Sequence, residues 1–220
     1  MTRLIPTMLL ATRNRGKLRE FQALLAPAGW EVIALQALDS TQDADEPNLE
    51  SRISQSRISR SPNHFEETGD SFGENARLKA LHYSRMSDLP VLGDDSGLEV
   101  FSLGGRPGIQ SARYAGPGAT DADRIRKLLA ELQPDRADRS ARFVCSLALA
   151  QWGTVLQEAE GECRGEIALE PKGTGGFGYD PIFFLPEFGC SMAELPEEEK
   201  NRISHRARAV ASLLAKIARA

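Results

Sequence analysis

The chain has 220 residues, of which 41% are hydrophobic, and its 31 acidic and 27 basic side chains give a net charge of −4. This length and apolar content suffice for a full hydrophobic core, and we predict a single domain over residues 1–220. The acidic balance argues against a nucleic-acid partner. Three widely spaced cysteines indicate neither a disulfide framework nor a zinc site. Because the sequence has neither a run of about 20 apolar residues nor a signal-peptide core, we expect no membrane association and a cytoplasmic location.

The first motif is a polar segment, residues 12–17, between a predicted strand and a predicted helix. The apolar residues 8–11 predict the strand, and apolar side chains recur at helical spacing from Leu18 to Leu25. Loop N–H groups, the positive end of a helix and the Lys17 ammonium all favour a bound phosphate. The spacing is not that of a Walker loop, and an ordinary turn with a solvated lysine is the alternative.

The stretch from about residue 41 to 64 is polar, contains two prolines and shows no sustained periodicity. This composition predicts a disordered insertion or a surface excursion. We interpret its near repeat, residues 51–54 and 56–59, as a duplicated surface segment.

An acidic pair, Glu66 and Glu67, precedes a predicted helix that begins after Ser71. Ser71 and Glu74 have the spacing of a capping box. A Mg²⁺ ion held by one or two carboxylates and by substrate phosphates needs a carboxylate from such a loop. A solvated acidic loop end is the alternative.

A second acidic pair, Asp94 and Asp95, follows the predicted strand 89–92 and lies between two glycines. Neighbouring side chains of a strand point to opposite faces, so we expect the two aspartates to have different roles. One can hold a divalent cation, and the other can brace the turn through backbone N–H groups. The alternative is an Asx-turn that uses both residues.

The remaining elements indicate a mixed α/β architecture. Thr120 and Asp123 have capping-box-like spacing before a predicted helix, and residues 143–150, 154–161 and 163–169 read as strands. Helices alternate with strands early in the chain and strands follow one another later. This order favours a mixed central sheet flanked by helices.

Two late segments carry candidate ligand-binding residues. Four glycines surround Phe177 in residues 172–181, and an exposed aromatic ring in such a loop is a natural stacking surface for a base. A plain glycine-rich hairpin is the alternative. Farther on, Lys200, His205 and Arg206 lie close to the start of a strongly periodic C-terminal helix. Positive side chains at a helix N-terminus oppose its dipole, which indicates placement for a ligand.

Six ordered segments resemble the inosine triphosphate pyrophosphatase family, and the resemblance runs from about Met8 to the C-terminus. They are TRNRGK, FEETGDSFGENARLKA, LGDDSGLEV, LGGRPGIQSARYAG, GTGGFGYDPIFF and ISHRARA. The resemblance implies Mg²⁺-dependent hydrolysis of ITP, dITP and XTP to the nucleoside monophosphate and pyrophosphate. It also implies an elongated, two-lobed α/β fold with the site in the cleft, and a homodimer. The insertion at about 41–64 departs from the family pattern.

The resemblance assigns roles to individual residues. Phosphate contacts are implied for Thr12, Arg13, Asn14, Arg15, Gly16 and Lys17. Glu66 and Asp95 would hold the metal, with Glu67 as the alternative to Glu66, and Asp95 would accept the proton of the attacking water. Further substrate contacts are implied for Lys79, Ser96, Phe177, Gly178, Tyr179, Asp180, Lys200, His205 and Arg206.

Two other functions stay open at this point. One is a pyrophosphatase of the related Maf type that acts on pyrimidine or modified nucleotides, against which the SHR and GGFGYD segments argue. The other is a catalytically silent nucleotide sensor. Retention of Asp95, Glu66, Lys17 and Lys79 together argues against a sensor.

Overall fold

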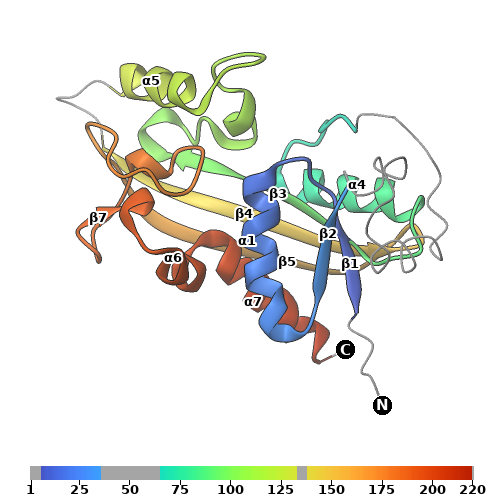
Figure 1. Ribbon diagram of the computed structural model, residues 1–220. Helices are drawn as coiled ribbons and strands as arrows, with labels where there is room; N and C mark the ends of the chain where they lie inside the picture. The colour runs from blue at the N-terminus through green and yellow to red at the C-terminus, as the bar shows by residue number, and fades with distance from the viewer. Residues whose placement is uncertain (1–5, 36–64, 133–137, 220) are drawn as a thin grey trace, which may run out of the picture. The chain divides into compact units, whose positions relative to one another are not determined.

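The structure is a computed structural model that describes residues 6–35, 65–132 and 138–219 (Figure 1). Its α-helices are α1 (Arg15–Leu25), α4 (Phe72–Ser84), α5 (Asp121–Glu131), α6 (Glu197–Ile203) and α7 (His205–Ile217). Its strands are β1 (Thr7–Leu10), β2 (Glu31–Ala34), β3 (Val91–Val100), β4 (Ser140–Gln151), β5 (Thr154–Ile167), β6 (Phe183–Leu185) and β7 (Cys190–Ser191). The 3₁₀ helices are η1 (Ala26–Ala28), η2 (Phe101–Leu103), η3 (Gly108–Arg113), η4 (Asp180–Ile182) and η5 (Met192–Glu194).

The strands form one mixed sheet in the order β2-β1-β3-β4-β5-β6-β7. β1 is parallel to both β2 and β3, whereas β5, β6 and β7 pair antiparallel. Parallel neighbours need a long crossover connection between them, usually a helix. The parallel pairs accordingly lie in the part of the chain where helices alternate with strands. The predicted mixed α/β sheet is therefore confirmed.

Two predicted strand boundaries are wrong. The strand expected to end before Gly93 continues to Val100, so Asp94 and Asp95 lie inside β3 and do not form an Asx-turn. The two strands expected at 154–161 and 163–169 are the single strand β5. In both places glycine and polar residues suggested a break, but sheet pairing holds the backbone extended.

The described chain divides into two compact units, and the first comprises residues 1–95, 146–160 and 210–220. In this unit α1 lies beside β1 and β2 (Figure 1) and buries Phe21 and Leu25. A core cluster joins side chains of β1, β2 and β3 and of the residues that directly follow β1 and β2: Leu9, Ala11, Ile33, Leu35 and Val91. Gly29 follows this helical region, with a left-handed φ of 81°.

Close packing of α4 on the sheet depends on small residues. Ala76 and Ala80 of α4 form a buried cluster with Ala148 and Ala150 of β4. A Cβ atom at Gly93 of β3 would lie 2.2 Å from the carbonyl oxygen of Ala76. Only glycine at this position lets the helix backbone approach β3 so closely, and this approach brings the polar residues of α4 next to Asp94 and Asp95.

The second unit comprises residues 96–145 and 161–209. Its core contains Leu98, Ile125, Leu128 and Phe143 together with side chains of β5, β6 and η4. The rings of Phe143 and Phe183 pack with centroids 4.4 Å apart. The capping box predicted for Thr120 and Asp123 is present at the start of α5.

Three predictions are left open by this description. The polar insertion at about 41–64 lies outside the described residues. The single-domain organisation and the cleft between lobes stay predictions.

Among the described helices, none combines the length and the apolar character that a membrane span needs.

Candidate active site

The loop between β1 and α1 uses several of its backbone N–H groups internally. The side-chain oxygen of Asn14, the N-cap of α1, accepts hydrogen bonds from the N–H groups of Gly16 at 2.8 Å and Lys17 at 3.0 Å. The hydroxyl of Thr12 accepts the N–H of Asn14 at 3.1 Å. These contacts cap the helix. A phosphate that uses the capped N–H groups must therefore displace the Asn14 side chain.

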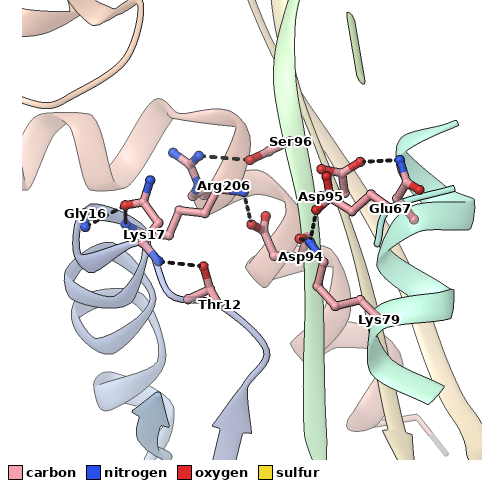
Figure 2. A network of polar contacts seen from close by, with 11 residues as sticks. Thr12, Gly16, Lys17, Glu67, Lys79, Asp94, Asp95, Ser96 and Arg206 are labelled. Atoms are coloured by element: carbon pink, nitrogen blue, oxygen red, sulfur yellow. Dashed lines mark hydrogen bonds and ion pairs between the residues drawn. The ribbon is translucent and has the colours of Figure 1, made fainter. Parts of the chain in front are cut away.

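Lys17 ties this loop to the middle of β3. Its ammonium lies 2.5 Å from Oδ2 of Asp94, whose side chain is fully buried. Asp94 and Asp95 are consecutive residues of a strand, so their side chains leave on opposite faces. Figure 2 shows Asp94 directed toward Lys17 and Asp95 directed toward Glu67. The sequence prediction of two different roles is consistent with this geometry.

Asp95 is a buried carboxyl group, 5% exposed, that accepts a hydrogen bond of 3.0 Å from Asn75. Burial raises the pKa of Asp95 to about 6, with two nearby lysines opposing this shift and Glu67 adding to it. The side chain is thus ionised at neutral pH and has a pKa close to that pH, which suits a general base.

Lys79 of α4 connects the acidic loop to β3. Its ammonium donates to Glu67 Oε1 at 2.5 Å and to the carbonyl oxygen of Asp94 at 2.8 Å. Burial alone would lower the pKa of Lys79, but the charges of Glu67 and Asp94 outweigh it and raise the pKa. Glu66, by contrast, is exposed. Of the two glutamates, Glu67 therefore lies beside the buried charges.

The charges of this group are compatible with a bound cation. When all are ionised, Glu67, Asp94 and Asp95 supply three negative charges against the two positive charges of Lys17 and Lys79, which leaves one negative charge. Nowhere in the described chain do three or more His, Cys, Asp or Glu side chains gather as a metal cage. Mg²⁺ usually takes one or two carboxylates and fills its other positions with water and phosphate. The residues present fit such an ion.

A second group of polar residues lies in the other unit, which begins with Ser96. Arg206 donates to the Ser96 hydroxyl at 2.9 Å, as Figure 2 shows. The guanidinium carbon of Arg206 lies 4.9 Å from the ring centre of Phe177, and the ammonium of Lys200 lies 5.3 Å from it. Both cations are almost completely buried. An aromatic face with two cations over it is suited to an electron-rich, planar ligand.

Asp180 holds this second group together. Its Oδ2 accepts the Lys200 ammonium at 2.7 Å and the N–H of Phe177 at 2.9 Å. A Cβ atom at Gly176 would lie 2.0 Å from the same oxygen. The glycine-rich segment therefore folds tightly around one buried carboxylate, and this fold fixes both Lys200 and the Phe177 backbone.

Three other predicted site residues have contacts within the protein. The Tyr179 hydroxyl donates to the carbonyl oxygen of Ser111 at 3.0 Å, and its ring belongs to the core of the unit. The N–H of Gly178 donates to Asp121 at 2.7 Å. The ring of His205 is buried and stacks on Phe143, with centroids 4.8 Å apart and planes 17° apart. These contacts give the three residues supporting functions in the fold.

A cavity of about 580 Å³ lies between α5 and the glycine-rich segment. Phe177, Ile125, Leu129 and Pro181 contribute its apolar lining, and Asp121 and Arg126 its charged groups. Phe177 thus borders both the cavity and the two cations described above.

Sequence reasoning located most of the residues that the structure brings together but missed Asn75. In the first unit, Lys17, Lys79 and Asp95 lie in one network with Glu67 (Figure 2). Asn75 belongs to the same network and is completely buried. Asn75 and Lys79 are four residues apart among alanines, so they share one face of α4. That spacing of two polar residues on an otherwise small, apolar face was the available signal.

Comparisons with known proteins agree with the motif resemblance. A family model described as the Ham1 family matches residues 8–216. A protein named dITP/XTP pyrophosphatase from Gloeobacter violaceus is 48% identical over 209 residues, 94% of this chain and 92% of the relative. Another of that name from Geobacillus kaustophilus is 48% identical over 207 residues, 94% and 91% of the two chains. The solved structure of a HAM1 protein from Coxiella burnetii is 41% identical, with a TM-score of 0.77, and the match covers 98% of this chain and 100% of that one.

Proposed function

Because the chain belongs to the Ham1 family, we propose that it is a nucleoside triphosphate pyrophosphatase. Its substrates are noncanonical purine nucleotides, ITP, dITP and XTP, which it hydrolyses to the monophosphate and pyrophosphate. The proposal agrees with the name dITP/XTP pyrophosphatase carried by relatives up to 48% identical. Its strongest structural support is Asp95, a buried carboxylate with a raised pKa beside two lysines and a second carboxylate.

The triphosphate binds to side chains at the start of α1. Arg13 and Arg15 are exposed there, and Lys17 lies beside them with its ammonium held by Asp94. Thr12, Asn14 and Gly16 contribute the hydroxyl and the N–H groups of the loop, with Asn14 yielding its capping bonds to a phosphate oxygen. Positive side chains in this position stabilise the departing pyrophosphate.

Asp95 and Glu67 would hold Mg²⁺, with Glu67 in place of the Glu66 that the motif resemblance suggested. Glu67 is preferred because it contacts Lys79 and raises the pKa of Asp95, whereas Glu66 is exposed. When bound, Mg²⁺ neutralises phosphate charge and makes a nearby water more acidic. Asp95 orients that water and accepts its proton during attack on the α-phosphorus. Lys79 donates hydrogen bonds both to Glu67 and to the backbone of β3, and so holds Glu67 close to this strand.

The base stacks on Phe177 and is read by Arg206 and Lys200. These two side chains only donate hydrogen bonds, which suits the 6-keto oxygen of hypoxanthine and xanthine and opposes the 6-amino group of adenine. Ser96 and Asp180 hold the two cations in place. His205 supports Arg206 through its stack on Phe143, and Gly178 and Tyr179 shape the segment that carries Phe177.

The homodimer and the cytoplasmic location stay predictions. Light scattering of the purified chain tests the dimer, and a mass of one protomer would contradict it.

A substrate panel tests the proposed function. We expect Mg²⁺-dependent pyrophosphate release from ITP, dITP and XTP, with much slower release from ATP and pyrimidine triphosphates. A preference for pyrimidine nucleotides would support a Maf-type activity instead. Tight ITP binding without any pyrophosphate release would support a nucleotide sensor.

A further inference from the structure

The side chain of Asn75 in α4 is completely buried and hydrogen-bonds both to Asp95 and to the loop that carries Glu67. Its Nδ2 donates to Oδ2 of Asp95 at 3.0 Å, across 20 residues of sequence. Its Oδ1 accepts the backbone N–H of Gly69 at 2.8 Å. Gly69 is two residues beyond Glu67, so one amide connects β3 to the loop that carries the second carboxylate.

The orientation of this amide is set by its partners. A backbone N–H only donates, so the Asn75 oxygen must face Gly69. Its NH₂ group then faces Asp95, where an ionised carboxylate only accepts. The amide thus supplies a donor on one side and an acceptor on the other without a charge. The loop is also packed tightly on the amide, because a Cβ atom at Gly69 would lie 2.8 Å from Oδ1.

We propose that Asn75 is a positioning residue that sets the separation and orientation of the Asp95 and Glu67 carboxylates. This inference rests on the proposed function, because it assigns these two carboxylates to the metal. By donating to Oδ2 of Asp95, Asn75 fixes the orientation of the carboxylate that the proposed function assigns to the metal and to the attacking water. By holding Gly69, it fixes the end of the loop that presents Glu67.

Two substitutions separate the two hydrogen bonds. Asn75→Asp keeps the acceptor for Gly69 but replaces the donor to Asp95 with a like charge. Asn75→Leu has a similar shape and removes both bonds. Loss of a group that orients a metal ligand typically costs 10–100-fold in metal affinity or activity. We therefore expect both variants to lower kcat by about 10–100-fold, and Mn²⁺ binding in the presence of pyrophosphate, followed by electron paramagnetic resonance, to weaken by a similar factor.

Ser84 supplies a matched control on the same helix. It is 1% exposed, donates to the carbonyl oxygen of Leu81 at 3.2 Å and accepts the N–H of Gly153 at 3.1 Å. Ser84→Ala also removes two hydrogen bonds of a buried side chain, but nine residues farther along α4. We expect it to lower the melting temperature while leaving kcat and Mn²⁺ affinity within about twofold of wild type, since it touches neither carboxylate.

The proposal is overturned if the folded Asn75 variants keep wild-type kcat and Mn²⁺ affinity, or if Ser84→Ala loses as much of both. Should the single variants fold poorly, the double variant Asn75→Asp with Asp95→Asn exchanges donor and acceptor. Asp95→Asn should raise the melting temperature more in the Asn75→Asp background than in the wild type, and an equal rise in both backgrounds would also overturn the proposal. If the wild-type chain releases no pyrophosphate, the proposed function is contradicted instead. The melting temperatures of the Asn75 and Asp95 variants then still test the hydrogen bond between these two residues.

Discussion

Lys17 and Asp94 form an ion pair at 2.5 Å although 77 residues separate them in the chain. The Asp94 carboxylate has no solvent exposure, and the Lys17 side chain is only 16% exposed. The pair joins the start of α1 to the middle of β3. We therefore expect Asp94 to act in the fold through this pair, and the proposed function assigns the chemistry to Asp95.

Lys17→Met is expected to destabilise the chain strongly, because it leaves the buried Asp94 carboxylate without its main counter-charge. Removing one partner of a buried pair typically costs about 3–5 kcal/mol. Urea unfolding of Lys17→Met, Asp94→Asn and the double variant measures the coupling. The double variant should recover most of the loss, and simple addition of the two single losses would contradict a direct pair.

Asp95→Asn should make the metal-free chain more stable at pH 8 and scarcely change it at pH 4. The folded pKa of Asp95 is about 6, above its ordinary 3.8, so between these values the folded state holds more protons than the unfolded state. Stability is therefore lost as the pH rises through this window, on the order of 3 kcal/mol for two pKa units. Thermal melts of both proteins from pH 4 to 8 test the sign.

The same substitution should cut turnover by roughly 10²–10⁴, the usual contribution of a positioned base. Near-normal turnover in Asp95→Asn would contradict its assignment as proton acceptor.

Gly93→Ala is expected to destabilise the chain by about 2 kcal/mol or more, because the added Cβ would lie 2.2 Å from the backbone oxygen of Ala76. Gly73→Ala is the matched control, since Gly73 lies in α4 with open space around its Cβ position. Alanine there should stabilise the helix by about 0.5–1 kcal/mol. Equal effects of the two substitutions in urea unfolding would refute the close contact between α4 and β3.

Arg206→Ala should reduce the preference for ITP over ATP, measured as the ratio of kcat/KM values, by about 10–100-fold. A donor that pairs with the 6-keto oxygen contributes to this ratio, and a site built on such pairing rejects the wrong analogue strongly. Phe177→Leu is the control, because an aromatic platform stacks on either base and its loss should lower both kcat/KM values alike. Retention of the full preference in Arg206→Ala would contradict the role of this arginine.

The features predicted correctly from sequence have local causes. The α1 helix and the capping box at Thr120 follow from residue types within a few positions. Asp94 and Asp95 interrupt the apolar pattern of β3, so the strand was predicted to end before them. Their partners Lys17 and Asn75, which are distant in the sequence, hold them within the strand. The contact between Asn75 and Asp95 depends on the approach of α4 to β3, which no local pattern encodes.

The most direct test of the account is ³¹P nuclear magnetic resonance of the products of ITP hydrolysis in ¹⁸O-water with Mg²⁺. The account predicts inosine monophosphate that carries one ¹⁸O atom and pyrophosphate that carries none, because Asp95 directs water to the α-phosphorus. Formation of inosine diphosphate and inorganic phosphate, or of labelled pyrophosphate, would contradict it.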